Sequence, residues 1–302
     1  MSDSRPHYTT PIRRITRTDC ETLIQLTLAE DTPAGDPTSE SIFSFEQHGT
    51  GRIVARESGV LCGLAVIEHL CEINRERTGH AVQYVSSLQD GQPFNAGAQL
   101  LQLHGPLPTI LTLERPVLNF LQYLSGISSV VARAVQAAGP DIAILDTRKT
   151  IPGYRKLAKY AVYCGGGTNH RICLSDMAMI KDNHVAAAGG ITNAVQAIRK
   201  RHPDLPLEVE VDALEQLSEA LPLQPDVILL DNMRRPDIER AVRMVQSHAA
   251  DNGGRAPFIE ISGGWRPDQL SELQGLGRLG VSMGYLTHTT RFLDLSMEFD
   301  DQ

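Results

Sequence analysis

Apolar and polar positions follow different patterns in the two halves of this chain. Up to about residue 125, short strand patterns at residues 52–56, 83–86 and 99–103 are separated by polar turns and helices in no fixed order. A longer segment, from Thr109 to Leu124, repeats apolar residues at the helical period of 3.6 and predicts a helix. This half is typical of an α+β layer.

Beyond about Ser128, predicted strands and helices alternate strictly. Short apolar runs bounded by turn residues are followed by segments with helical periodicity. The predicted strands fall at residues 142–145, 178–180, 207–211, 227–230, 258–261 and 279–283. Repeated βα units of this kind predict a parallel sheet, and six in a row favour an α/β barrel.

The predicted strands end in polar residues. In α/β barrels the loops that follow the strands converge around one mouth, where the chemistry takes place. The strand ends here read Asp146-Thr-Arg-Lys149, Lys181-Asp-Asn-His184, Glu210, Asp231-Asn232, Ser262-Gly-Gly264 and Gly284. A purely structural barrel has no need of an ionisable residue or glycine turn after every strand, so the pattern indicates an active site.

Charge is distributed unevenly along the chain. The formal net charge is −8, yet residues 146–184 contain seven Lys or Arg against three Asp. Two like charges 4 Å apart repel by about 4 kcal/mol at an effective dielectric of ~20, so clustered cations indicate an anionic ligand. The candidates are Arg148, Lys149, Arg171 and Lys181, which lie beside loop residues. The overall acidity argues against a nucleic-acid-binding protein.

Two carboxylates and two glycine turns complete this predicted mouth. Glu210 and Asp231 are either ion-pair partners of the cations or a Mg²⁺ site shared with a phosphorylated substrate. Glu208 alternates with Glu210 along one strand, points the same way and competes for that role. The turns Ser262–Gly264 and Gly284 lie where barrels hold a phosphate on main-chain N–H groups.

Two reaction types are compatible with these residues. One is transfer at an activated sugar carbon, in which the cations stabilise a leaving phosphate group. The other is Schiff-base aldol chemistry on Lys181 or Lys149. Both lysines have Asp or Arg neighbours rather than a desolvated setting, so transfer is favoured. His170, after the glycines at 165–167, is either a hydrogen-bonded loop histidine or a ligand contact, and its neighbour Arg171 favours the latter.

Cysteine spacing and the length of the apolar runs indicate the cellular compartment of the protein. The five cysteines show no CxxC spacing, which predicts reduced thiols rather than disulfides or a zinc site. The polar N-terminus has no apolar core of a signal peptide, and its first ~10 residues are predicted to be poorly ordered. The longest apolar run, residues 59–67, is shorter than the ~20 residues of a membrane span. We therefore expect a soluble, cytoplasmic protein.

An ordered series of motifs extends along nearly the whole chain. It comprises Leu-Ala-Glu-Asp (28–31), Gly-Asp (35–36), Glu-Arg-Pro-Val-Leu-Asn-Phe-Leu-Gln (114–122), Leu-Ser-Gly-Ile (124–127), Leu-Asp-Thr-Arg-Lys-Thr (145–150), Tyr-Ala-Val (160–162), Cys-Gly-Gly-Gly (164–167), Asn-His-Arg (169–171), Ile-Lys-Asp-Asn-His (180–184), Glu-Val-Glu-Val (208–211), Leu-Asp-Asn-Met (230–233), Ser-Gly-Gly (262–264) and Leu-Thr-His (286–288). This series resembles the quinolinate phosphoribosyltransferases, also called carboxylating nicotinate-nucleotide pyrophosphorylases. It departs from their pattern at Trp265 and at Tyr285, which follow the two glycine turns.

The resemblance implies a fold, a reaction and an assembly. The implied fold is an N-terminal α/β sandwich over residues 1–127, with 287–302 packing back on it, and an open α/β (TIM-like) barrel over 128–286. The implied reaction converts quinolinate and phosphoribosyl pyrophosphate to nicotinate mononucleotide, pyrophosphate and CO₂ in NAD biosynthesis. The implied assembly is a homodimer in which Arg115 reaches the site of the neighbouring subunit.

The resemblance also implies roles for individual residues. Arg148, His170 and Arg171, with Arg115, would hold the two carboxylates of quinolinate. Lys149 and Lys181 would stabilise phosphoribosyl pyrophosphate, and Glu210 and Asp231 would bind Mg²⁺; these four form the implied catalytic set. The 5′-phosphate would lie on Ser262, Gly263, Gly264, Gly284 and His288.

Two alternatives share this fold. A molybdenum-utilisation accessory protein would have a transport-linked binding role, and the presence of Lys181 argues against it because a binder has less need of a cation for a transition state. A phosphoribosyltransferase for nicotinate would meet one carboxylate rather than two. The set Arg115, Arg148, His170 and Arg171 fits two carboxylates better.

Overall fold

The computed structural model describes residues 11–299, and these divide into two compact units. A parallel-sheet unit contains residues 133–149 and 167–285. An antiparallel-sheet unit contains residues 12–132, 150–166 and the C-terminal segment from 286. The segment 150–166, placed by the sequence in the barrel range, carries α5 (Arg155–Cys164) and belongs to the antiparallel-sheet unit.

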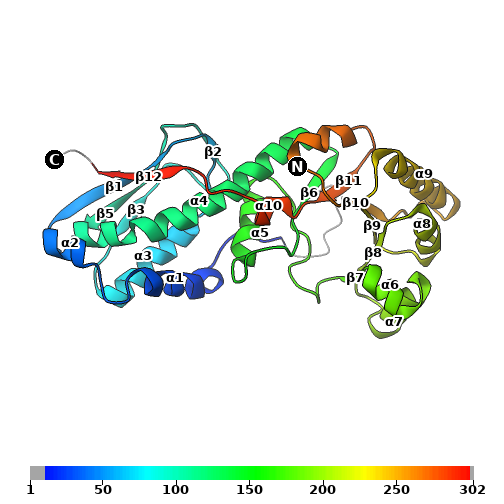
Figure 1. Ribbon diagram of the computed structural model, residues 1–302, viewed down its shortest axis with the longest axis horizontal. Helices are drawn as coiled ribbons and strands as arrows, with labels where there is room; N and C mark the ends of the chain where they lie inside the picture. The colour runs from blue at the N-terminus through cyan, green and yellow to red at the C-terminus, as the bar shows by residue number, and fades with distance from the viewer. Residues whose placement is uncertain (1–10, 300–302) are drawn as a thin grey trace. The chain divides into compact units, whose positions relative to one another are not determined.

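The antiparallel-sheet unit is built on four strands in the order β12-β1-β5-β3 (Figure 1). Their bounds are β1 (His48–Ala55), β3 (Gln83–Val85), β5 (Gln99–Pro106) and β12 (Leu295–Phe299). The last strand of the chain thus pairs with the first, Leu295 lying opposite Ala55. The same unit contains a short antiparallel pair of strands, β2 (Gly59–Val60) and β4 (Pro93–Phe94). It also contains the helices α1 (Arg17–Asp31), α2 (Pro37–Ile42) and α3 (Leu64–Thr78).

One helix, α4 (Leu107–Ala138), contains the segment from Thr109 to Leu124 that the apolar period predicts as a helix. It continues well beyond the predicted end at Leu124. The apolar stripe itself is confirmed, since its members are all fully buried: Ile110, Leu113, Val117, Leu121 and Leu124. Gly126 lies inside α4, and a side chain at this position would meet the main-chain oxygen of Arg291. This glycine permits close packing and does not end the helix.

The parallel-sheet unit confirms the predicted α/β fold. Its six strands follow the order β6-β11-β10-β9-β8-β7, and all neighbours are parallel. The bounds are β6 (Ile142–Leu145), β7 (Ala178–Ile180), β8 (Leu207–Val211), β9 (Val227–Asp231), β10 (Phe258–Ser262) and β11 (Leu279–Ser282). With β6 and β7 at opposite edges, the sheet is an open barrel-like one.

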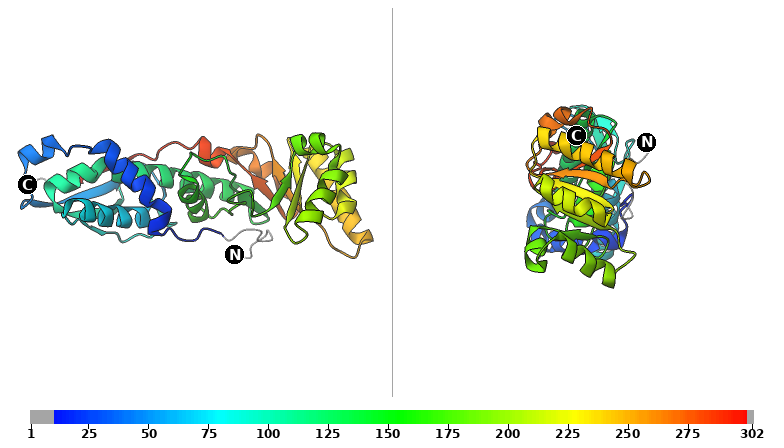
Figure 2. Two further views of the ribbon diagram at one scale, coloured as in Figure 1. Left: turned by 90° about the horizontal axis from the view of Figure 1, so that it is seen from below. Right: turned by 90° about the vertical axis from the view of Figure 1, so that its right-hand side faces the viewer.

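Helices cover this sheet in chain order (Figures 1 and 2). They are α6 (Asp182–Ala188), α7 (Ile191–Arg201), α8 (Leu214–Ala220) with the 3-10 turn η1 (Leu221–Leu223), and α9 (Arg235–Asp251). After β10 the connection contains a 3-10 helix, η2 (Pro267–Leu273). A short helix, α10 (Tyr285–His288), follows β11. Over residues 11–299, no helix combines the length and apolarity needed to cross a membrane.

Candidate active site

The predicted site residues of the parallel-sheet unit collect at the C-terminal ends of its strands. Because neighbouring strands are parallel, their ends lie along one edge of the sheet. Ser262, the last residue of β10, pairs in register with Asp231, the last residue of β9. Glu210 lies near the end of β8, and Lys181 directly follows β7. The sequence had placed chemistry at this edge, and the register brings those strand ends together.

Lys181 and Glu210 form an ion pair between their Nζ and Oε2 atoms. The Glu210 side chain is 13% exposed and that of Lys181 44%. Asp231 accepts a 2.7 Å hydrogen bond from the side chain of Asn232. The structure therefore leaves both interpretations of Glu210 open: it neutralises a cation, and with Asp231 it offers the carboxylate oxygens that Mg²⁺ prefers.

The segment Thr168–Arg171 is tied to the end of β6 by Asp146. This buried carboxylate accepts hydrogen bonds from the His170 main chain (2.8 Å) and from the Asn169 side chain (2.7 Å). Thr168 donates its N–H to Ile144 (2.7 Å), which extends the edge of β6. A fully buried carboxylate is stable only when it is hydrogen-bonded, so Asp146 fixes the main chain of this loop.

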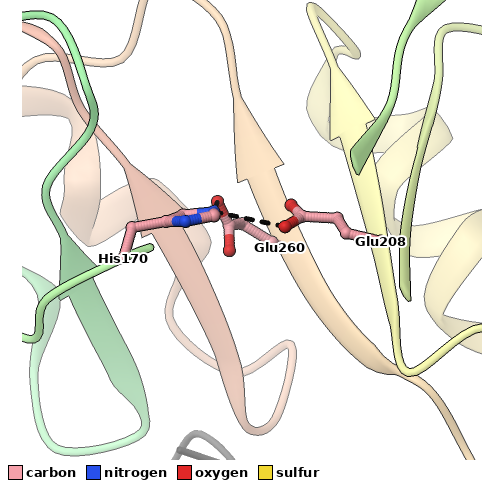
Figure 3. Close-up of side chains that lie close together, drawn as sticks. All are labelled: His170, Glu208 and Glu260. Atoms are coloured by element: carbon pink, nitrogen blue, oxygen red, sulfur yellow. Dashed lines mark ion pairs between the residues drawn. The ribbon is translucent and has the colours of Figure 1, made fainter. Parts of the chain in front are cut away.

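His170 points into the interior of the unit, between two glutamates (Figure 3). Its Nε2 atom lies 3.3 Å from Glu208 Oε2 and 3.2 Å from Glu260 Oε1. His170 is 4% exposed, and both glutamates are 0% exposed. Its Nδ1 atom accepts a 2.7 Å hydrogen bond from the main-chain N–H of Arg171. Nδ1 is thus hydrogen-bonded, and Nε2 lies within ion-pair distance of both carboxylates.

Opposing influences act on the protonation of this ring. Burial disfavours the imidazolium, but Glu260 and Glu208 outweigh it and raise the pKa of His170 to about 9. The Arg171 N–H acts the other way, because it needs the lone pair of Nδ1. A second proton on Nδ1 would abolish that hydrogen bond.

Arg171, at the end of the loop Thr168–Arg171, and Arg148, which follows β6, are two cations of this region. Arg171 is 7% exposed and donates from Nη1 to the main-chain oxygen of Met177 (2.9 Å). Burial and the neighbouring charge of Arg148 lower the pKa of Arg171, whereas Glu208 raises it. Two guanidinium groups close enough to affect each other are an unfavourable pair in the absence of an anion. They are therefore suited to hold one.

The turn after β10 brings main-chain groups close to the end of β9. Gly263 and Gly264 have φ angles of +97° and +73°, which favour glycine. A Cβ atom on Gly263 would lie 2.8 Å from the main-chain nitrogen of Asn232, whereas one on Gly264 would meet nothing within 4 Å. Asn232 also has a positive φ, +54°, and donates its N–H to Ser262 (3.0 Å). This turn is shaped by close approach.

The remaining predicted residues are placed as follows. Lys149 is exposed, and its N–H donates to the side chain of Thr147 (3.0 Å). Gly284 follows β11 and is half-buried. Arg115, exposed on α4, and His288, exposed at the end of α10, belong to the antiparallel-sheet unit. Their predicted roles stay predictions.

Sequence reasoning missed two residues of this site, Glu260 and the anchoring role of Asp146. Glu260 is a charged residue between isoleucines in a strand that is otherwise apolar. It also alternates with Ser262, so it lies on the same face as that predicted site residue. A buried carboxylate in such a position needs a partner, which was an available signal.

A cavity of about 430 Å³ opens beside the loops that follow β8 and β9. Its lining mixes acidic residues (Asp212, Glu215 and Asp237) with Arg234 and Arg240. It shares Asn232 with the candidate site, since this residue donates to Asp231 and to Ser262, and none of the predicted site residues lines it.

Comparison with known proteins identifies the family. The model of the quinolinate phosphoribosyl transferase N-terminal domain matches residues 36–125, and that of the C-terminal domain matches residues 127–298. A probable carboxylating nicotinate-nucleotide pyrophosphorylase of Bacillus subtilis is 39% identical over 271 residues, 89% of each chain. The corresponding Mycobacterium leprae protein is 39% identical over 293 residues, 93% of this chain and 99% of its own.

Solved structures agree with these matches. NadC from Streptococcus pyogenes superimposes with a TM-score of 0.87 at 36% identity, covering 95% of this chain and 99% of its own. The nicotinate-nucleotide pyrophosphorylase from Francisella tularensis gives the same TM-score at 33% identity, covering 97% and 100%. Since both domain models match in order and the relatives align over most of their length, the chain belongs to the quinolinate phosphoribosyltransferase family.

Proposed function

We propose that this chain converts quinolinate and phosphoribosyl pyrophosphate to nicotinate mononucleotide, pyrophosphate and CO₂, as a step of NAD biosynthesis. The names of its relatives support this reaction. The structural observation that carries the choice of substrate is the proximity of Arg148, which follows β6, to Arg171, which lies in the loop anchored by Asp146. Two neighbouring guanidinium groups suit a ligand with two carboxylates, because each can bind one through its planar fork.

In this proposal the cationic side chains at the end of β6 and in the loop Thr168–Arg171 orient quinolinate. Arg148 and Arg171 bind the two carboxylates, and His170 belongs to the same binding region. Holding the ring at both carboxylates aligns its nitrogen with the sugar carbon, which removes much of the entropic barrier to a two-substrate reaction. Arg115, donated by the second subunit of a homodimer, would complete this grip.

Glu210 and Asp231 would hold Mg²⁺ together with oxygens of phosphoribosyl pyrophosphate. The donor set fits, since Mg²⁺ in proteins often takes one or two carboxylates and completes its shell with water and substrate phosphates. When bound, Mg²⁺ neutralises charge on the pyrophosphate. Lys181, already paired with Glu210, would place its ammonium beside the same group, and Lys149 would do so from the end of β6.

The 5′-phosphate would lie on the turn Ser262–Gly264 and on Gly284, with His288 nearby. Main-chain N–H groups in such turns bind phosphate without a cationic side chain. The positive φ angles of Gly263 and Gly264 support this assignment, because they form a glycine turn directly after β10.

The chemical steps need no protein nucleophile. The pyridine nitrogen forms a bond to C1 of the ribose, while the C1–oxygen bond breaks and its electron pair leaves with pyrophosphate. The quaternised nitrogen then accepts electron density as the adjacent C2 carboxylate leaves as CO₂, and a proton takes its place on the ring. Lys149 and Lys181 act on the charge of the leaving group, which is where electrostatic stabilisation contributes most.

The cytoplasm is the proposed compartment. All five cysteines are free thiols, and three of them are buried, which suits a reducing environment.

A paired turnover assay tests the proposed function. The purified chain is given Mg²⁺ and phosphoribosyl pyrophosphate with either quinolinate or nicotinate, and nicotinate mononucleotide and CO₂ are followed. We expect product from quinolinate alone and its loss in Lys149→Ala and Arg171→Ala, with Lys200→Ala, on the exposed end of α7, as the control. Turnover of nicotinate alone, or of neither compound, would contradict the proposal.

A further inference from the structure

The segment 172–176 connects the loop Thr168–Arg171 to β7. Asp146 holds the loop on the side of β6. On the other side, the tip of the segment is exposed: Leu174 is 64% exposed, and Ser175 is exposed as well. Apolar burial therefore stabilises the tip very little, and we expect polar contacts to order it.

One carboxylate closes this segment. Asp176 Oδ2 accepts the main-chain N–H of Ile172 at 2.7 Å and that of Cys173 at 3.2 Å. The other oxygen, Oδ1, accepts the thiol of Cys173 at 2.8 Å. Aspartate side chains commonly close turns by binding nearby main-chain N–H groups in this way. The main chain thus folds back so that Asp176 lies beside the residues that follow Arg171.

The residues on either side of this closed segment interact with each other. Arg171, directly before Ile172, donates from Nη1 to the main-chain oxygen of Met177, directly after Asp176, at 2.9 Å. Its Nη2 lies 3.5 Å from the sulfur of Met179. The guanidinium is therefore directed by the same fold-back that Asp176 closes. If the segment opened, Met177 would no longer be held opposite Arg171.

We propose that Asp176 is a positioning residue of the quinolinate site: by binding the N–H groups of Ile172 and Cys173, it fixes the guanidinium of Arg171 for a carboxylate of the substrate. This inference rests on the proposed function, in which Arg171 binds that carboxylate. Asp176 acts through the main chain and does not itself touch quinolinate. Such a contact matters because a displacement of about 1 Å in a binding group can cost ~100-fold in rate.

The negative charge of Asp176 is the rival explanation. Asp176 raises the pKa of Arg171, whereas Arg148 lowers it, so the carboxylate would then act by offsetting the repulsion between two guanidinium groups. The two explanations have different requirements. Closing the turn requires an acceptor oxygen at the position of Oδ2, whatever its charge. An electrostatic effect requires the charge and tolerates a small displacement of it.

Three substitutions of Asp176 separate these explanations. Asp176→Asn keeps the shape and an acceptor oxygen but removes the charge. Asp176→Glu keeps the charge but moves its oxygens by one methylene group, and Asp176→Ala removes both. Cys173→Ala removes only the thiol donor and leaves both N–H contacts in place. Asp204→Ala, in the exposed turn before β8, is the matched control.

Two kinds of measurement are made on each variant. Steady-state kinetics give kcat and KM for quinolinate and for phosphoribosyl pyrophosphate separately. Hydrogen exchange at the main-chain N–H groups of Ile172 and Cys173 reports whether the turn is closed, and thermal unfolding reports the overall stability.

We expect kcat/KM for quinolinate to fall by about 10- to 100-fold in Asp176→Ala and in Asp176→Glu, mainly through KM. Asp176→Asn, Cys173→Ala and Asp204→Ala should stay within about threefold of the wild type. KM for phosphoribosyl pyrophosphate should not change in any of them. Exchange at the two N–H groups should be faster in the Ala and Glu variants of Asp176 than in the wild type.

Three results would overturn the inference. If Asp176→Asn is impaired as much as Asp176→Ala, the charge is responsible. If Asp176→Ala lowers Tm but keeps kcat/KM for quinolinate, the contact only stabilises the fold. If exchange at Ile172 and Cys173 is equally fast in the wild type and in Asp176→Ala, the carboxylate does not hold the turn.

Asp176→Glu carries the same comparison if Asp176→Ala does not fold. If the wild type does not turn over quinolinate at all, the proposed function fails and the role in quinolinate binding fails with it. Hydrogen exchange still decides whether Asp176 holds the turn beside Arg171.

Discussion

The glycine turn after β10 offers a sharp test, because its two glycines differ in one respect. Both Gly263 and Gly264 have positive φ, so alanine at either position is strained by about 1–2 kcal/mol. Only at Gly263 would the new Cβ atom also lie 2.7 Å from Cγ and 2.8 Å from the main-chain nitrogen of Asn232. The difference between the two variants therefore isolates the steric effect.

That steric effect should be visible in stability. Inserting a methyl group into a packed site costs about 1–3 kcal/mol, so Gly263→Ala should be less stable than Gly264→Ala by that amount. For a domain of this size the difference corresponds to roughly 2–12 °C in Tm. Thermal unfolding of the two purified variants measures it directly.

The same substitution should also weaken phosphate binding. Asn232, which Gly263→Ala would displace, donates to Asp231 and to the main chain of Ser262. Because each 1.4 kcal/mol corresponds to a factor of ten, a cost of about 1–3 kcal/mol that falls on the bound state would raise KM for phosphoribosyl pyrophosphate by about 5- to 140-fold in Gly263→Ala. We expect a smaller change in Gly264→Ala. Equal Tm and equal KM in both variants would refute the reasoning from close approach.

Three further predictions concern other parts of the chain. Lys181→Met removes the ion-pair partner of Glu210. Turnover of quinolinate in steady-state assays should then fall by about 100-fold or more. Retained turnover would argue against a role for the Lys181 ammonium in the reaction. Gly165→Ala would place a Cβ atom 2.5 Å from the main-chain oxygen of Ser128, so urea titration should show a loss of about 1–3 kcal/mol, and an unchanged midpoint would contradict this packing. Asp36→Ala removes the cap of α2 and should cost about 1 kcal/mol at neutral pH, whereas Asp36→Asn should cost less. Hydroxyl and N–H donors of the first turn of α2 lower the pKa of Asp36. The stabilisation of the folded state by this cap is therefore present above the ordinary pKa of 3.8 and is lost as the pH falls through the lowered value. A cost of Asp36→Ala that is equal at pH 7 and at low pH would contradict this prediction.

The alternation of strands and helices in the second half was predictable from local pattern. Buried parallel strands are apolar on both faces, so each appears as a short apolar run, and all six predicted runs coincide with strands β6 to β11 within a residue or so. The continuity of α4 was not predictable in this way. The requirement for glycine at position 126 comes from Arg291, which is far along the chain and whose main-chain oxygen lies close to that position.

The candidate site, too, was predictable from local pattern only in part. The order of residues along the chain shows which side chains follow the strand ends, and hence that Lys181, Glu210, Asp231 and Ser262 share one edge, because parallel strands align their C-terminal ends. The meeting of Glu260 with Glu208 at His170 follows from the fold alone. Charge and alternation show that a residue points inward, but the register between strands and the path of the intervening loop determine which side chains it meets there.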